Sequence, residues 1–402
     1  MKRRVVVTGM GVVSPIGVGI SLFRKNLFEG MSGRGPIQSF EAASFPVREA
    51  YEVRNFESRS HGTHLLDPFI QYAVAAAGEA LQMAGFEPEH ADLFRIAISV
   101  SSSKGGVHTI DRFKERFVKH PSAILGARIY ANTVPNFGAQ WIARRWKIQG
   151  PAKCFVAACA TGTVAVTEGA RMVSDGTADY CLAGASDASV VPVLLAAYRN
   201  MKALSRQERM RPFDKRRDGF MVGEGAGIVF LETLESAKAR GAKIFGEILG
   251  GAYGSDATDA LHFNRAGDGL ARALGKALGN HQLEAEDIGY VNLHGTATVL
   301  GDLYETEQIK KAFGRKAFAI PMSSIKGATG HMLGASGAVE VIATLLAMQE
   351  SRIPPTLGLE MPDPACDLDY TPLEARPAKI DHAISLSMGF GGHIAVLALR
   401  KL

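Results

Sequence analysis

A cysteine and two histidines in this sequence have the residue types and surroundings needed for nucleophilic catalysis. Cys159 lies in the run FVAACATGTVAV, and no charged residue stands between Lys153 and Glu168. Such a cysteine is either an inert core thiol or a nucleophile activated from elsewhere in the chain. A short apolar strand pattern precedes Cys159 and a helical pattern follows it. We therefore expect the thiol at a helix N-terminus, where unpaired N–H groups favour an anion and lower the thiol pKa.

The first histidine stands beside two hydroxyl groups. The segment VNLHGTATVLGD places His294 at the end of an apolar run, followed by Thr296, Thr298 and Asp302. A neutral imidazole here can donate a hydrogen bond to a developing oxyanion, and the two hydroxyls can bind a polar ligand tail. The alternative is a histidine that is satisfied by a turn carbonyl, with the threonines and the aspartate as turn formers.

The second histidine follows a lysine in SSIKGATGHMLGASGAVE. Lys326 and His331 are separated by Gly-Ala-Thr-Gly, and Glu340 is the only charge between His331 and Glu350. A carboxylate among apolar residues is costly unless it is paired, so we expect Glu340 to hold a site residue in place. Lys326 has the alternative of a solvated loop position. Because no carboxylate or further histidine stands at ligand spacing beside either histidine, we expect no metal site.

Glycines surround one aromatic residue near the C-terminus, in SMGFGGHIAVLAL. We interpret this segment as a strand broken by Gly389, Gly391 and Gly392 around Phe390. The glycines would allow close approach of the backbone and leave the Phe390 N–H free to complete an oxyanion hole with that of Cys159. A simple β-bulge is the alternative.

Two pairs of segments repeat along the chain. CATGTVAVTEGARMV from Cys159 matches HMLGASGAVEVIATL from His331, and GEGAGIVFLE from Gly223 matches GFGGHIAVLA from Gly389. Two matches in the same order and at similar spacing favour an internal duplication. Strand-like runs alternate with helical stretches, which predicts an α/β protein of two pseudo-symmetric halves, residues 1–242 and 243–402. This alignment gives Cys159 and His331 equivalent places, so we expect the symmetry to bring them together.

Composition indicates a globular protein without a strong excess of either charge. Of 402 residues, 47% are hydrophobic and 21% charged, with a net charge of +5 and no long block of like charge. This pattern gives no support for nucleic-acid or membrane binding and is compatible with an acidic protein partner. The four sparse cysteines lack CxxC spacing, which predicts reduced thiols and a cytoplasmic location. Neither a secretory signal nor a membrane span is expected.

Taken in order, the chemical motifs resemble those of a known enzyme family. ACATGT with Cys159, HGTAT with His294, KGATGH with Lys326 and His331, and GFGG with Phe390 are similar to the β-ketoacyl-acyl-carrier-protein synthases of the KAS I/II class. The resemblance runs from VVVTGMGVVSPIG to IAVLAL and includes RPFDKRRDGFMVGEGAG. It implies a duplicated thiolase-like fold with α-β-α-β-α layers, and a homodimer.

The resemblance also implies a decarboxylating Claisen condensation in acyl-chain elongation of the fatty-acid type. Cys159 would accept an acyl group from the phosphopantetheine of an acyl carrier protein, and the enzyme would hold no cofactor of its own. His294 and His331 would stabilise the malonyl thioester oxygen as CO2 leaves. The remaining implied roles are positive potential from Lys326, oxyanion binding and gating by Phe390, pantetheine contacts by Thr296 and Thr298, support by Asp302 and Glu340, acyl-pocket lining by Tyr198 and carrier docking by Lys202.

The sequence departs from the family pattern at a few positions. His393-Ile394 follows GFGG, Val299 follows HGTAT, and the loop after Ala257 is altered. An alternative is therefore a ketosynthase of a dedicated polyketide, polyene or specialised lipid pathway. A non-catalytic ketosynthase partner subunit normally lacks the nucleophile, so Cys159 argues against it. A thiolase would need a second active-site cysteine where Phe390 stands. We expect residues 101–113 to set the depth of the acyl pocket.

Overall fold

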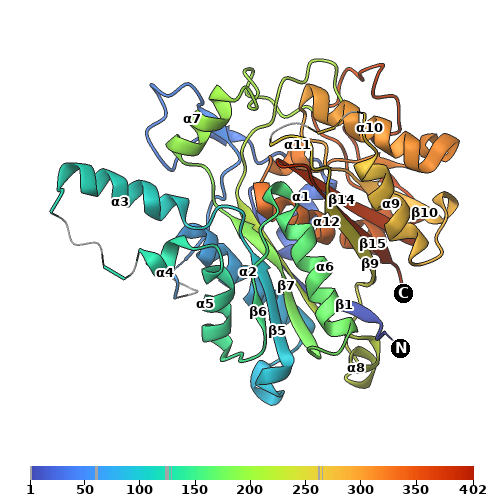
Figure 1. The fold of residues 1–402 in the computed structure, drawn as a ribbon, viewed down its shortest axis with the longest axis horizontal. Coiled ribbons are helices and arrows are strands. Elements are labelled where there is room, and N and C mark those ends of the chain that lie inside the picture. Colours follow the sequence, from blue (N-terminus) through green and yellow to red (C-terminus); the bar gives the residue numbers. More distant parts are fainter. Residues whose placement is uncertain (1, 59–61, 123–125, 128, 261–262, 265) are drawn as a thin grey trace.

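One long sheet runs through the molecule (Figure 1). The computed structural model describes residues 2–58, 62–122, 126–127, 129–260, 263–264 and 266–402. Within these residues eleven strands share the sheet, in the order β11-β10-β14-β15-β9-β1-β8-β7-β5-β6, with β2 paired to β1. The bounds are β1 Val5–Ser14, β2 Gly17–Val18, β5 Ile96–Ser101, β6 Ala152–Lys153, β7 Tyr180–Asp187, β8 Gly225–Thr233, β9 Gly246–Ser255, β10 Ile288–Asn292, β11 Met322–Ser323, β14 His382–Gly389 and β15 His393–Arg400.

The sheet consists of two groups of five strands with the same topology. β1 and β9 meet at the centre, where Val5 pairs with Ile248 and Val7 with Gly246. Outward from β1 follow β8, β7, β5 and β6, and outward from β9 follow β15, β14, β10 and β11. In both groups the first two pairings are antiparallel and the last two are parallel. The shared order confirms the predicted duplication.

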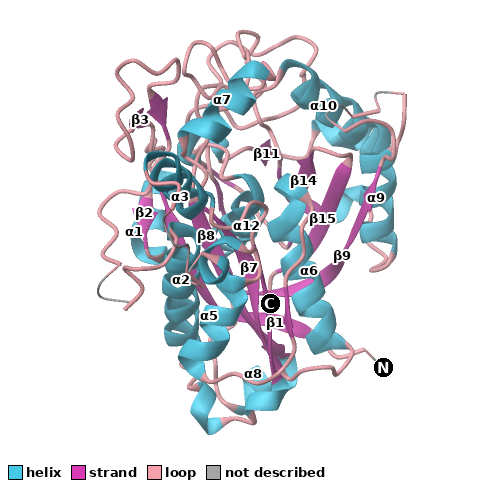
Figure 2. Ribbon diagram, turned by 60° about the vertical axis from the view of Figure 1, so that its left-hand side comes forward, coloured by secondary structure: helices cyan, strands magenta, loops and turns pink. Residues whose placement is uncertain are grey.

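Helices lie on both outer faces of the sheet groups and between them (Figures 1 and 2). α2 (Pro68–Ala84) and α5 (Phe137–Trp146) cover the N-terminal group, and α9 (Gly269–Gly279) and α10 (Val299–Phe313) cover the C-terminal group. α6 (Thr161–Ser174) and α12 (Ser336–Glu350) pack against both groups and each other. α12 is buried from Ser336 to Met348, as its apolar sequence requires. The predicted α-β-α-β-α layering is confirmed.

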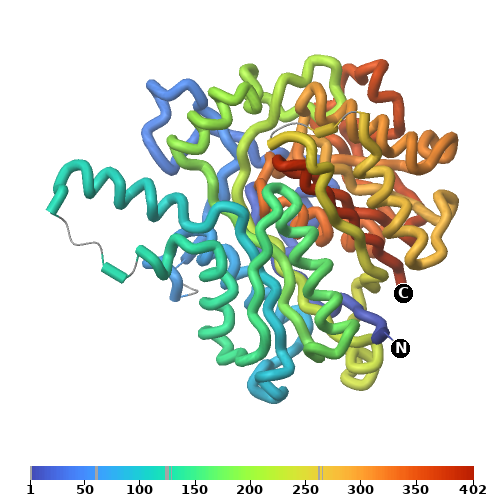
Figure 3. Tube along the Cα trace, in the orientation of Figure 1, coloured from blue at the N-terminus to red at the C-terminus, as the bar shows by residue number. Residues whose placement is uncertain are grey.

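Shorter elements carry the loops around this frame. α3 projects from the body of the molecule, as the chain trace shows (Figure 3). The remaining bounds are α1 Ile20–Phe28, β3 Gly35–Pro36, β4 Glu49–Ala50, α3 Val107–Lys119, α4 Tyr130–Thr133, α7 Pro192–Asn200, α8 Leu234–Ala239, α11 Lys326–Thr329, β12 Arg352–Ile353 and β13 Arg376–Pro377, with 3-10 turns η1 Pro88–His90, η2 Leu93–Arg95, η3 Ala158–Ala160, η4 Ala285–Asp287, η5 Gly314–Phe318 and η6 Leu333–Ala335.

The two central helices begin in the same way, and this corrects the alignment of the repeat. η3 precedes α6 and η6 precedes α12, and both turns open with a non-glycine residue in the left-handed region, Ala158 at φ 47° and Leu333 at φ 50°. Cys159 therefore corresponds to Gly334. The prediction that it corresponds to His331, three residues earlier, was wrong.

The second sequence match is displaced as well. Asp187 pairs with Gly225 across β7 and β8, and Gly389 pairs with His393 across β14 and β15. Gly225 thus corresponds to His393, whereas the sequence match placed it on Gly391. Both segments are rich in glycine and small apolar residues, so short matches fit at several alignments that only the strand pairing distinguishes.

The central helices cross at a pair of equivalent glycines, Gly162 and Gly337, each the second residue of its helix. A Cβ added at Gly162 would lie 2.5 Å from the Ala338 nitrogen, and one added at Gly337 would lie 2.3 Å from Thr163 Oγ1. The two backbones are therefore in direct contact. This contact places the N-termini of α6 and α12, and the residues just before them, at one point between the halves.

Candidate active site

Cys159 lies at that point, in the turn η3 immediately before α6. The residue is 8% exposed, and its Sγ lies 3.1 Å from Nε2 of His331. The preceding Ala158 has φ 47°, a conformation that costs free energy for a residue with a side chain. The N–H groups of the first helical turn have no partner inside the helix. The nucleophile candidate therefore has an imidazole at hydrogen-bond distance and backbone donors beside it.

The pKa of the Cys159 thiol is not lowered, contrary to our expectation. Burial raises it to about 11, and the charges of Lys104 and Lys326 oppose this rise. Burial also holds the pKa of His331 well below 6.5, with Lys326 and Lys104 adding to the effect. The resting pair is therefore a neutral thiol beside a neutral imidazole, because removal from water disfavours both charged forms. The 3.1 Å contact leaves His331 Nε2 in position to accept the thiol proton.

His331 is held through its backbone and its ring. Its N–H donates to the Met221 carbonyl at 2.8 Å, and its carbonyl accepts from the Gly223 N–H at 2.9 Å. Nδ1 lies 3.2 Å from Ser336 Oγ, and the ring packs edge-on against Phe220 with centroids 5.1 Å apart. These contacts leave Nε2 directed at the thiol of Cys159.

His294 faces His331 with its ring nearly perpendicular, at 85° and a centroid distance of 5.5 Å. The ammonium of Lys326 lies 3.4 Å from His294 Nδ1 and donates to the His294 carbonyl. An ammonium has only donors, so Nδ1 must accept and Nε2 must carry the proton. Burial and the Lys326 charge keep the pKa of His294 well below 6.5. His294 is thus a neutral imidazole whose Nε2–H is available as a donor.

Lys326 is fully buried at the start of α11 and forms an ion pair with Glu340 of α12. Burial raises the pKa of Glu340, and Lys326 opposes that rise. The structure excludes the alternative of a solvated loop lysine. A buried ammonium needs such a partner, so Glu340 fixes Lys326 and, through it, the tautomer of His294.

Glu305, on α10, is a site residue that our sequence analysis missed. Its carboxyl accepts from the backbone N–H groups of His294 at 2.6 Å and Gly295 at 2.8 Å, and burial raises its pKa to about 8. Asp302, which the sequence singled out, instead accepts from the Phe213 N–H at 2.8 Å and lies 3.7 Å from Arg217. The spacing of the two acids, one helical turn apart, was the available signal for Glu305.

The two predicted hydroxyls lie side by side just before α10. Thr296 Oγ1 and Thr298 Oγ1 are 3.1 Å apart. Thr296 is buried and Thr298 is half-buried, whereas Val299 and Leu300 beyond them are each 53% exposed. The hydroxyls therefore lie along the chain between the buried His294 and the exposed start of α10.

Phe390 stands in a hairpin turn, which corrects the broken-strand interpretation and its bulge alternative. β14 ends at Gly389 and β15 begins at His393, and Gly391 and Gly392 turn the chain with φ values of 80° and 72°. A Cβ at Gly389 would lie 2.9 Å from the Cys159 nitrogen, so the end of β14 touches the Cys159 backbone. Within the described residues, the Phe390 N–H makes no hydrogen bond.

The structure places Tyr198 near the site and Lys202 on the surface. Tyr198 is buried on α7 in the apolar cluster that includes Cys159, and the half-buried Phe390 packs against this cluster. The Tyr198 ring meets Phe220 at 5.5 Å. Lys202 follows the end of α7 and is exposed.

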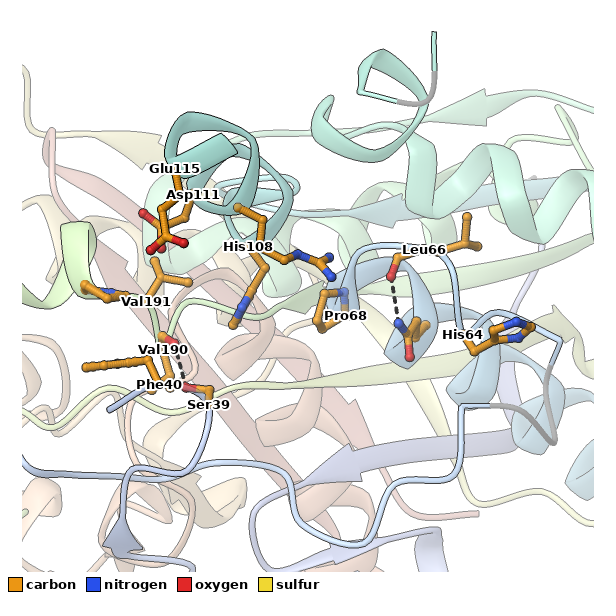
Figure 4. Close-up of a pocket in the computed structure, with 13 residues that line it drawn as sticks. Ser39, Phe40, His64, Leu66, Pro68, His108, Asp111, Glu115, Val190 and Val191 are labelled. Carbon is orange, nitrogen blue, oxygen red and sulfur yellow. Dashed lines mark hydrogen bonds between the residues drawn. The ribbon is translucent and has the colours of Figure 1, made fainter. Parts of the chain in front are cut away.

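A cavity of about 420 Å³ lies between α3 and two loops (Figure 4). Figure 4 shows His108, Asp111 and Glu115 of α3 on one side and Phe40 and Val190 on the other. Val190 also belongs to the apolar cluster around Cys159. Residues 101–113 thus border a cavity next to that cluster, and its α3 wall is polar and charged.

Groups that could hold a metal ion lie away from these residues. Among the described residues, the one cluster of potential ligands is Glu87, Glu89 and His90, which are exposed around η1. In the part of the chain that the structure describes, no helix combines the length and the apolar character needed to cross a membrane.

Comparisons with known proteins place the chain in a family. The β-ketoacyl synthase N-terminal domain matches residues 2–237, and the β-ketoacyl synthase C-terminal domain matches residues 245–360. Proteins named 3-oxoacyl-[acyl-carrier-protein] synthase 2 from Synechocystis sp. and Staphylococcus aureus (strain COL) are each 37% identical to it, covering 100% of this chain and 98% and 99% of theirs.

Solved structures agree with this assignment. The ishigamide ketosynthase/chain length factor superposes with a TM-score of 0.95 at 34% identity. A β-ketoacyl synthase from Burkholderia phymatum superposes with a TM-score of 0.91 at 32% identity, and both comparisons cover 100% of each chain. The chain therefore belongs to the β-ketoacyl synthase family of condensing acyltransferases.

Proposed function

We propose that this protein is a 3-oxoacyl-[acyl-carrier-protein] synthase that joins a Cys159-bound acyl group to malonyl carrier protein with loss of CO2. The observation that carries the proposal is the 3.1 Å contact between Cys159 Sγ and His331 Nε2, with His294 and the buried Lys326 beside them. This arrangement supplies a nucleophile, a base in contact with it and a second neutral donor.

The first step is acyl transfer to Cys159. Sγ attacks the carrier thioester carbon, a new C–S bond forms, and the bond to the pantetheine sulfur breaks. His331 takes the thiol proton and returns it to the departing pantetheine thiolate. The tetrahedral oxyanion is bound by the backbone N–H groups of Cys159 and Phe390. The contact between Gly389 and the Cys159 backbone supports this role, because it brings the two segments together.

The second step is decarboxylation and condensation. As the C–C bond of the malonyl group breaks and CO2 leaves, the electron pair moves onto the thioester, where the Nε2–H of His294 donates to the oxygen. His331 adds a second donor in the tautomer that carries its single ring proton on Nε2, a proton shift made through solvent after Cys159 has been acylated. The resulting carbanion attacks the acyl carbon on Cys159. The C–S bond to Cys159 then breaks, and the Cys159 thiolate takes up one proton from the solvent. Lys326 supports this step by fixing the His294 tautomer and by adding positive potential.

An acyl carrier protein is the proposed partner, and its phosphopantetheine is the only prosthetic group in the reaction. Thr296 and Thr298 would contact this arm, in agreement with their place between the buried His294 and the exposed start of α10. Lys202 would contact the acidic carrier, and Arg206, Arg209 and Lys215 add exposed positive charge to the chain that follows it. One solved relative, at 31% identity, is titled as a ketosynthase in complex with its acyl-carrier protein.

We further propose that the protein acts as a cytoplasmic homodimer. β6 ends the sheet with two exposed residues, and Val156, between β6 and Cys159, is 59% exposed. α3 extends from the body with Phe117 and Val118 exposed. A free sheet edge and unpaired apolar side chains favour contact with a second copy. The four cysteines are free, which suits a reducing compartment.

Fatty-acid-type elongation is favoured over the specialised-pathway alternative by the names of the curated relatives. A non-catalytic partner subunit is disfavoured because Cys159 is present and in contact with His331.

A reconstituted condensation assay tests the proposal. Purified protein with one carrier protein loaded with an acyl group and another loaded with malonyl should release CO2 and form a 3-oxoacyl carrier product, measured by mass spectrometry. Cys159→Ser should abolish product formation, because a neutral serine hydroxyl is a far weaker nucleophile. Cys154→Ser, which changes a half-buried thiol outside the site, should leave it intact. Absence of product with the unaltered protein, or full activity of Cys159→Ser, would contradict the proposal.

A further inference from the structure

Asp187 is a buried carboxylate to which the proposed chemistry assigns no role. It is the last residue of β7 and is 0% exposed. A buried carboxylate is costly unless donors surround it, so its place at the junction of the two halves needs a reason. Its hydrogen-bond partners provide one.

The carboxylate joins a loop of the N-terminal half to the turn that follows His331. Oδ1 accepts from Ser102 Oγ at 2.5 Å and from the Ser103 N–H at 3.1 Å. Oδ2 accepts from Ser103 Oγ at 2.5 Å and from the Gly334 N–H at 2.7 Å. Three of these donors belong to the N-terminal half, and the fourth belongs to η6 of the C-terminal half.

Gly334 packs so closely against the Asp187 carboxylate that no side chain could be accommodated there. A Cβ added at Gly334 would lie 2.6 Å from Asp187 Oδ2 and 2.7 Å from the Ser103 Cβ. η6 therefore lies directly on the end of β7 and on the loop after β5. Because His331 stands three residues before Gly334, a shift of η6 would move the imidazole relative to Cys159.

The other side of His331 is held by the chain that leads into β8. Met221 and Gly223 bond to the His331 backbone on both of its polar groups, and Gly225, two residues on, pairs with Asp187 itself. The end of β7 thus contacts the chain on both sides of His331. It binds Gly334, which follows the histidine, and it pairs with Gly225, next to the segment that bonds to the histidine backbone. Cys159 belongs to the same half as these supports.

We propose that Asp187 is a positioning residue that holds His331 at hydrogen-bond distance from Cys159 by binding the Gly334 N–H. The inference rests on the proposed function for its catalytic consequence, but the contact between His331 and Cys159 can be tested without the condensation reaction. The carboxylate acts through η6 and touches neither the reacting atoms nor the substrate.

Asp187→Asn is the direct test, because it keeps the shape and replaces one acceptor oxygen by a donor. In either amide orientation at least one N–H of Ser103 or Gly334 faces an NH2 group. We expect kcat per titrated Cys159 to fall about 100-fold while KM for malonyl carrier protein stays within about twofold, as a displacement near 1 Å predicts. Asp175→Asn, the same change at an exposed carboxylate after α6, should leave both constants unchanged.

The alkylation of Cys159 by iodoacetamide separates positioning from a general loss of structure. Wild-type protein should react at neutral pH because His331 Nε2 lies at hydrogen-bond distance from the thiol and can accept its proton. Asp187→Asn should react about tenfold more slowly at pH 7, and the difference should vanish as the pH approaches the thiol pKa of about 11. A purely structural defect would change the rate at every pH. An alkylation profile and kcat equal to those of wild type would overturn the proposal.

Ser103→Ala keeps the test decisive if Asp187→Asn does not fold. It removes one donor from the same oxygen that binds Gly334 and leaves the carboxylate in place. We expect a fall in kcat of about threefold with the same pH signature. An unchanged profile in this variant overturns the inference. Because alkylation needs no carrier protein, a wild-type protein without condensation activity would refute the proposed function while leaving this test valid.

Discussion

The turn η3 before α6 and the turn η6 before α12 have similar backbone conformations but carry different residues at the equivalent position. Both open with a left-handed residue, and both lead into a buried central helix. The N-terminal turn carries Cys159, whereas the C-terminal turn carries Gly334, which is fixed by Asp187. Duplication thus supplied two equivalent helix N-termini. One presents Cys159, the proposed nucleophile, and the other is bound by Asp187 just after His331.

The largest effect is expected from a change in the C-terminal half that should slow malonyl decarboxylation much more than acylation of Cys159. Lys326→Met removes the donor that sets the His294 tautomer, so malonyl decarboxylation should fall about 10²- to 10³-fold. Acylation of Cys159 should change much less, since the Cys159–His331 contact remains. The measurement is CO2 release in parallel with the mass of the acylated protein.

Cys159→Ala provides the reciprocal control for this comparison. It should lose acylation entirely and retain decarboxylation, because His294 and Lys326 are untouched. Equal loss of both steps in both variants would show that the two halves do not divide the chemistry in this way.

The next effect concerns the glycine contact on which the symmetry depends. Gly337→Ala places a methyl group 2.3 Å from Thr163 Oγ1, and overpacking of this kind should lower the free energy of unfolding by about 2 kcal/mol. Chemical denaturation measures this value. Gly275→Ala, in α9 with no atom within 4 Å of the new Cβ, should instead stabilise the protein by about 0.5 kcal/mol. Equal effects of the two variants would argue against a tight helix crossing.

A smaller effect is expected where β14 meets the nucleophile. Gly389→Ala puts its Cβ 2.9 Å from the Cys159 nitrogen, so the oxyanion donors of Cys159 and Phe390 should separate slightly. We expect the rate of Cys159 acylation to fall about tenfold, with a smaller change in malonyl decarboxylation. Stopped-flow acylation and CO2 release measure the two rates, and an unchanged acylation rate would remove this backbone pair from the oxyanion site.

The smallest effect is expected from the charge of Lys104 on the pKa of Cys159. Of the charges that lower the pKa of Cys159, Lys104 has the largest effect. Lys104→Met should therefore raise that pKa further and slow alkylation at pH 8. The pH dependence of iodoacetamide labelling measures this shift. An unchanged or lowered pKa would mean that the Lys104 charge does not reach the thiol.

The same thiol has a predictable influence on folding stability. Its folded pKa of about 11 exceeds its usual value of 9.0, so the folded state binds the proton more tightly than the unfolded state. The stability from this thiol is therefore full below pH 9 and is lost as the pH rises through 11. Cys159→Ala should flatten this part of the unfolding curve against pH.

The sequence was sufficient to predict the duplicated α/β frame, the helix N-terminus at Cys159 and a buried partner for Glu340. The alignment of the two halves wrongly made Cys159 equivalent to His331. Segments of glycine and small residues match at several alignments, and strand pairing is needed to choose one. Glu305 was missed although it stands one helical turn after Asp302. Asp187 was missed because a carboxylate becomes a support only when folding buries it beside N–H and O–H donors. The thiol pKa was misjudged because local sequence gives the helix terminus but not the degree of burial.

The most direct test of the central claim is to locate the acyl group on the protein. Wild-type protein is incubated with acyl carrier protein that has been loaded with an acyl group, and is then digested and sequenced by tandem mass spectrometry. We predict a thioester on the peptide that contains Cys159 and none on the peptides of Cys154, Cys181 or Cys366, because Cys159 alone has an imidazole in contact with its sulfur within the described structure. An adduct on another cysteine, or acylation that persists in Cys159→Ser, would contradict the claim.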